Sequence, residues 1–79
     1  MGMTTATTAT VANLERCIGA LVTVATRAHA SPRWQTPREV TGVVVGMTRL
    51  LGGTRVLCVL CSGRLEAVPI DAITRLERK

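Results

Sequence analysis

Four segments of the chain are rich in β-branched and aliphatic residues, and apolar positions alternate with polar ones in parts of them. This pattern is typical of β-strands. Turn residues separate the segments, because Gly52-Gly53 and Ser62-Gly63 each predict a tight turn. Segment 28–37 is polar, contains two prolines and predicts a loop. The predicted strands are 20–27, 38–48, 54–61 and 64–68.

The second predicted strand contains two glycines, Gly42 and Gly46, four residues apart. Glycine inside a strand indicates a bend, a bulge or a close approach of another backbone. A strongly curved small barrel needs such a bend. The spacing therefore predicts that this strand is bent.

The third predicted strand is apolar on both of its faces. Val56 and Leu60 lie on one face, with Leu57 and Val59 on the other. A strand of this kind is covered on both sides. In so short a chain the cover is either a second subunit or the predicted N-terminal helix, and self-association into a homo-oligomer is expected.

The two ends of the chain carry different signals. Residues 1–10 form an uncharged Thr/Ala-rich tail that we expect to be disordered, and 11–79 form one small domain. Residues 10–18 predict a short helix that ends at Gly19. Near the C-terminus, PIDAI predicts a 3₁₀ turn before a closing strand, ITRLER. A helix starting at Asp71 fits the same apolar spacing and remains open.

Together these elements predict a mainly β protein, a small five-stranded barrel with a short N-terminal helix. The segments ALVTVATR, EVTGVVVGM and LEAVPIDAITRL resemble the strands of the Sm-like family, which includes bacterial Hfq. They also resemble the SH3-like C-terminal domain of the ribosome maturation factor RimP. The resemblance implies a fold and a tendency to assemble. The Asp and the Met-Asn pair that carry RNA contacts in the Sm family are absent, so no family RNA-binding residue carries over.

The net charge of +5 raises the expectation of an anionic partner, either nucleic acid or an acidic protein surface. Three cysteines with no secretory signal indicate reduced thiols and a cytoplasmic setting. No apolar run approaches the roughly 18 residues that a membrane span needs, so no membrane partner is expected.

The loop between the first two strands holds the strongest candidate residues. Arg27, Arg33 and Arg38 are suited to phosphate contacts, and the only aromatic residue, Trp34, stands among them. Three roles for Trp34 remain open: stacking on an unpaired base, anchoring a partner protein, or plugging one end of the barrel. Outside this loop, Arg49 and Arg55 flank the turn after the second strand and are further candidates for binding nucleic acid or a partner protein.

No set of side chains predicts an enzyme, and no catalytic residue or cofactor is expected. Cys58 and Cys61 have CxxC spacing, but in a strand their thiols point to opposite faces, so no metal site is expected. The sequence thus favours a non-enzymatic nucleic-acid-binding protein, RNA before DNA. The alternative is an adaptor or inhibitor that docks on a partner protein through the Trp34 loop.

Overall fold

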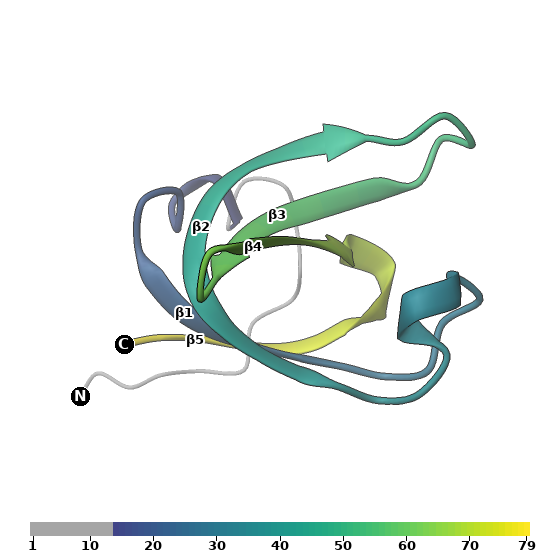
Figure 1. Cartoon of the computed structure of the whole chain (residues 1–79), viewed down its shortest axis with the longest axis horizontal. Helices are drawn as coiled ribbons and strands as arrows, with labels where there is room; N and C mark the ends of the chain where they lie inside the picture. The colour runs from purple at the N-terminus through teal and green to yellow at the C-terminus, as the bar shows by residue number, and fades with distance from the viewer. Residues whose placement is uncertain (1–13) are drawn as a thin grey trace.

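The computed structural model describes residues 14–79, which form one antiparallel sheet of five strands (Figure 1). The order of strands across the sheet is β4-β3-β2-β1-β5. The strands confirm the predicted segments to within one or two residues at each end. In chain order the elements are β1 (Leu21–Thr26), η1 (Pro32–Trp34), β2 (Glu39–Arg49), β3 (Arg55–Cys61), β4 (Arg64–Pro69), η2 (Ile70–Ala72) and β5 (Ile73–Arg78).

Strand β2 is bent, as its two glycines predicted. A Cβ atom at Gly42 would overlap the backbone carbonyl of Leu60 and would lie 2.9 Å from Cγ1 of Val59. Only glycine permits this approach of β2 to β3. The register between β2 and β3 then shifts between Val44 and Gly46, which indicates a β-bulge. The close approach and the bulge let one long strand turn around the core.

The sheet curls strongly but does not close, so the predicted barrel is wrong in this respect (Figure 1). The two edge strands, β4 and β5, are joined through the 3₁₀ turn η2 and share no ladder. Pro69 ends β4 and has no N–H to donate, and η2 redirects the chain directly after it. The two edges therefore stay apart.

The C-terminal segment is a strand, so the alternative helix from Asp71 is wrong. β5 pairs with β1 through partners such as Val24 and Leu76. Pairing with the buried strand β1 stabilises this segment more than the helical spacing of its apolar residues would. At the other end, the predicted helix 10–18 begins outside the described residues, as does the predicted tail 1–10. The described part of that helix, from Leu14, forms a run of hydrogen-bonded turns that ends at Ala20.

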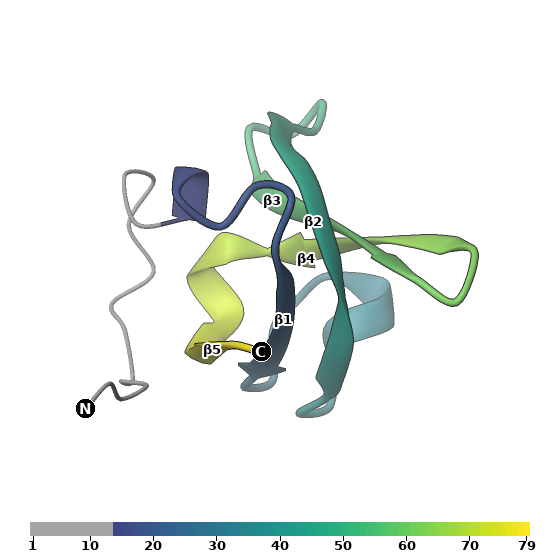
Figure 2. The ribbon, with the colours of Figure 1, turned by 90° about the vertical axis from the view of Figure 1, so that its left-hand side faces the viewer.

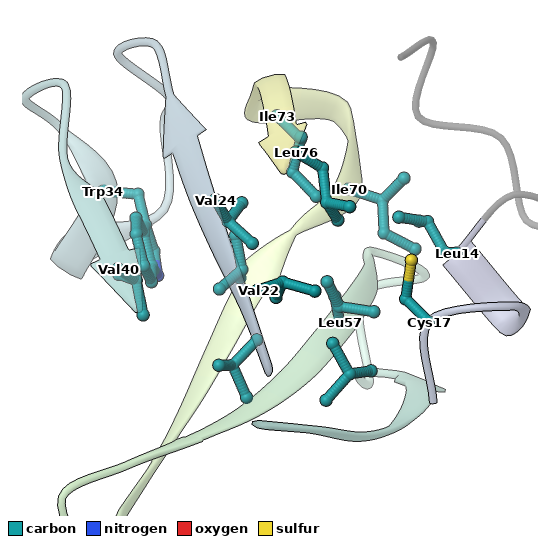
Figure 3. Close-up of a cluster of buried hydrophobic side chains, with 13 residues drawn as sticks. Leu14, Cys17, Val22, Val24, Trp34, Val40, Leu57, Ile70, Ile73 and Leu76 are labelled. Atoms are coloured by element: carbon teal, nitrogen blue, oxygen red, sulfur yellow. The ribbon is translucent and has the colours of Figure 1, made fainter. Parts of the chain in front are cut away.

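The core lies on the concave face of the sheet and is aliphatic apart from one tryptophan and one cysteine (Figure 3). Val22, Val24 and Leu57 are fully buried at its centre. Leu14 and Cys17 cover one end of the core, and Trp34 lies against Val40 at the other (Figure 3). Each end of the core is thus covered by a segment outside the sheet. No helix in residues 14–79 has the length and apolar character to cross a membrane.

A row of apolar side chains crosses the convex face of the sheet. Leu21 pairs with Val43, Val43 with Leu60, and Leu60 with Leu65, so the row spans β1, β2, β3 and β4. Directly opposite residues in a ladder project from the same face. Leu21, Leu60 and Leu65 are 47%, 43% and 61% exposed, respectively, so nothing among residues 14–79 covers this row. β3 is therefore covered on its inner face and only partly on its outer face.

Candidate functional site

The loop between β1 and β2 is held in one conformation by short hydrogen bonds. At its base, the Thr26 N–H donates to the Arg38 carbonyl at 2.8 Å, and the Arg38 N–H donates to Thr26 Oγ1 at 3.2 Å. Within the loop, the His29 N–H donates to the Trp34 carbonyl at 2.8 Å, and Nδ1 of His29 accepts from the Ser31 N–H at 3.1 Å. His29 therefore shapes the loop. The candidate arginines consequently stand on a defined backbone.

Trp34 is buried, with only 3% of its surface exposed, and belongs to the hydrophobic core. The Arg38 guanidinium carbon lies 4.2 Å from the centroid of the ring, a cation–π contact. Arg38 also donates from Nη1 to the Arg33 carbonyl at 3.3 Å. Of the three roles left open for Trp34, this burial supports the plug, since stacking or anchoring needs an exposed ring face. Trp34 instead positions Arg38.

Two arginines from the loop converge on one carboxylate of β4. Nη2 of Arg33 and Nη2 of Arg38 each lie 3.7 Å from Oε2 of Glu66. This separation is an ion pair without a short hydrogen bond. The side chains of Arg33 and Arg38 are 61% and 31% exposed, whereas that of Glu66 is only 12% exposed. The cluster thus has one surplus positive charge and guanidinium donors that face solvent.

Beside this cluster lies an apolar groove with a volume of about 210 Å³. Its walls come from the loop, from the turn between β2 and β3, and from the outer side of β3 and β4. Arg33 supplies its charged rim. The groove is lined by Ser31, Pro32, Arg33, Trp34, Leu50, Val56, Ala67 and Pro69. Such a groove can accept a flat apolar group while a guanidinium binds an adjoining anion.

The six candidate residues do not form one site. Arg33, Trp34 and Arg38 come together, as their closeness in sequence predicted. Arg27 points elsewhere: its Nη2 donates to the Asp71 carbonyl at 2.9 Å, and its N–H donates to the Ala72 carbonyl at 2.9 Å. Arg27 therefore ties the end of β1 to η2.

Arg49 and Arg55 form a separate basic pair. They are directly opposite each other at the end of the β2–β3 ladder. They line a second, more open groove of about 340 Å³ together with Glu15, Met47, Thr48 and Ile70. Within residues 14–79 neither arginine lies within ion-pair distance of a carboxylate. Neither charge is thus neutralised by a contact ion pair, although Glu15 lines the same groove.

Glu66 is the residue of the site that sequence reasoning missed. It pairs with the buried Val59 across the β3–β4 ladder and faces the core side. The signal was present, because strict alternation along 64–68 places Glu66 on the same face as Val68.

The pKa of the Cys61 thiol is shifted by the charges of Glu66 and Arg38. Burial raises the pKa of Cys61, the Glu66 carboxylate raises it further, and the Arg38 guanidinium acts in the opposite direction. The thiol is therefore protonated at neutral pH and is a poor nucleophile. Cys58 is three residues away on β3, so the two thiols lie on opposite faces of the strand. No group of three His, Cys, Asp or Glu side chains within residues 14–79 gathers closely enough to hold a metal ion.

Comparison of the chain with protein families, with characterised proteins and with solved structures gives no match. A function is therefore inferred from the geometry of the loop, the groove and the distribution of charge.

Proposed function

We propose that this chain is a non-enzymatic nucleic-acid-binding protein, with single-stranded RNA as its first ligand class. Arg33 and Arg38 contact backbone phosphates, and an unpaired base lies over the adjoining apolar groove. The observation that carries the proposal is the sharing of one carboxylate, Glu66, by the exposed guanidinium of Arg33 and the half-buried one of Arg38 beside that groove. A phosphate supplies the second anion that this arrangement lacks.

The charge of the whole surface supports the same ligand. The ion pairs of residues 14–79 involve Arg33, Arg38 and Arg75 only. Among the described residues, the other arginines and the lysine form no ion pair, and the net charge of the chain is +5. A surface of this kind attracts a polyanion over a long range and gives binding that weakens as salt rises.

The order of the strands supports the proposed SH3-like or Sm-like relationship. An open, curled five-stranded sheet whose edge strands are joined by a 3₁₀ turn is consistent with the segments that resemble those families. A shared fold does not establish a shared function. The nucleic-acid proposal therefore rests on Arg33, Arg38 and the groove rather than on the fold.

Replacing Arg33 with alanine tests the proposal directly. We expect the affinity for a single-stranded RNA oligonucleotide to fall about tenfold, because a charge-assisted contact is lost. The slope of log affinity against log salt should become shallower by about 0.7. Arg78→Ala, which removes the same charge from the exposed end of β5, is the control and should change affinity much less. Equal losses in both variants would show that RNA contacts the protein without using this site.

One observation favours a protein ligand in the same groove. Its walls are mainly aliphatic and proline side chains, and Trp34 exposes no face on which a base can stack. An apolar side chain flanked by a carboxylate would fit such a site, with Arg33 meeting the acid. In that case RNA affinity would be negligible at physiological salt, and Arg33→Ala would weaken a protein complex instead.

The apolar row on the convex face supports the proposal that the chain self-associates. Leu65→Lys places a charge in the most exposed part of this row. If two copies meet on the row, we expect the variant to sediment as a monomer at concentrations where the unmodified chain associates, since an unpaired charge in an apolar contact is costly. Identical sedimentation of the two proteins at all concentrations would rule this interface out.

A further inference from the structure

The turn between β2 and β3 carries the most exposed apolar side chain of residues 14–79. Leu51 is fully exposed, at 104%, and its neighbour Leu50 is 48% exposed. In two views at right angles the turn projects from the body of the sheet (Figures 1 and 2). Leu51 thus presents its whole side chain to the surroundings.

The backbone of this turn is well defined. The Leu50 N–H donates to the Thr54 carbonyl and the Gly53 N–H donates to the Leu50 carbonyl, each at 2.8 Å. Gly53 has a φ of +90°, a conformation that favours glycine. These two hydrogen bonds fix the turn that carries the exposed Leu51, so burial of this side chain needs an apolar medium from outside the described residues.

Directly behind the leucines stand Arg49 and Arg55. The two are opposite each other in the ladder, an arrangement that is unfavourable for like charges. No carboxylate of residues 14–79 lies within ion-pair distance of either side chain. An anionic group bound next to Arg49 and Arg55 would relieve the repulsion between their guanidinium groups.

We propose that this hairpin tip binds an anionic lipid surface. Leu51 and Leu50 enter the boundary between headgroups and acyl chains, and Arg49 and Arg55 contact lipid phosphates one residue behind them. The apolar face of an interfacial amphipathic helix is buried about 5–10 Å deep at such a boundary, and we expect a similar depth for these two leucines. Basic residues beside them add attraction to anionic headgroups.

The tip favours a lipid surface over a nucleic acid because of the leucines. A phosphodiester backbone binds the two arginines but offers no apolar volume to an aliphatic side chain held at the end of a turn. A bilayer can accept both groups at once, because the leucines at the tip reach the acyl chains while the arginines behind them stay at the level of the headgroups. The mode requires no membrane-spanning segment, so the lack of a long apolar run does not bear on it. The nucleic-acid proposal rests on Arg33, Arg38 and the groove beside them, which shares only Leu50 with the tip, so variants of Leu51, Arg49 and Arg55 test the lipid inference separately.

The test is co-sedimentation of the full chain with phosphatidylcholine vesicles, with and without phosphatidylserine. We expect binding only when phosphatidylserine is present. Leu51→Asp should weaken it at least tenfold, since burial of a leucine is lost. Arg49→Ala and Arg55→Ala should each weaken it about fivefold. The matched controls are Ile18→Asp, at a side chain that is 50% exposed outside the hairpin, and Arg78→Ala.

Several results would overturn the inference. Absence of binding to phosphatidylserine vesicles is one, and equal binding to neutral vesicles is another. Equal losses of vesicle binding in Leu51→Asp and Ile18→Asp would show that the added negative charge, and not the loss of a leucine at the tip, weakens binding. If Leu51→Asp lowers the sedimenting mass without vesicles, the tip is a contact between copies of the chain. If Arg49→Ala weakens RNA binding and leaves vesicle binding unchanged, the pair belongs to a nucleic-acid site. Circular dichroism of each variant shows that it is folded.

Discussion

Replacing Trp34 with alanine is expected to lower the free energy of unfolding by about 3–5 kcal/mol, the usual effect of removing a buried aromatic side chain. The ring lies against Val40 in the core (Figure 3). It is 3% exposed, and the Arg38 guanidinium lies over its face. Its loss would leave a cavity at one end of the core and would release Arg38. Because a single hydrophobic core in a chain of this size rarely supplies more than about 3–5 kcal/mol, much of the variant should be unfolded at moderate temperature.

Urea unfolding followed by far-ultraviolet circular dichroism measures this effect, since the variant lacks the only tryptophan. Trp34→Phe is the control: it keeps an apolar ring in the same place and should lose less stability than the alanine variant. An alanine variant as stable as the unmodified chain would show that the ring does not belong to the core, and would reopen the base-stacking role.

Replacing Gly42 with alanine is expected to lower the free energy of unfolding by about 1–3 kcal/mol or more. This is the range found when extra atoms are forced into a packed region. The added methyl group would meet the backbone carbonyl of Leu60, which belongs to a strand and cannot rotate aside, and Cγ1 of Val59 at 2.9 Å. To relieve the overlap, β2 must move away from β3 at its bend. The midpoint of thermal or urea unfolding reports the loss.

Gly46→Ala is the matched control for this prediction. Gly46 lies on the same strand, at the bulge, and a Cβ atom there would meet nothing within 4 Å. We expect the control to differ from the unmodified chain by a few tenths of a kcal/mol, as is usual for substitutions outside packed regions. Equal losses in the two variants would mean that β2 tolerates no side chain at either glycine, and the close approach to Leu60 would not be the cause.

The order of elements was predictable because it depends on local signals. Alternation and β-branched residues defined the strands, and Gly52-Gly53 and Ser62-Gly63 defined the tight turns. Whether the curled sheet closes was not predictable, because it depends on where β4 and β5 lie after η2. That is a long-range property which no local pattern encodes.

The candidate site was predictable only in part, for a similar reason. Arg33, Trp34 and Arg38 share one short loop, so their closeness follows from the sequence. The burial of Trp34 and the position of Glu66 opposite the two arginines depend on how the loop folds against β4. Arg27 was a candidate binding residue because of its charge, yet its guanidinium donates a hydrogen bond to a backbone carbonyl of η2.

The most direct test of the nucleic-acid proposal is the RNA affinity of Glu66→Gln, measured by titration at low and at physiological salt. Glu66 competes with phosphate for Arg33 and Arg38, so we expect its neutralisation to raise affinity several-fold. Glu39→Gln makes the same change of charge at a residue that pairs with Arg75, and should raise affinity much less. If Glu66→Gln leaves RNA affinity unchanged or lowers it, or matches Glu39→Gln, the shared carboxylate is structural and the proposed phosphate site is wrong.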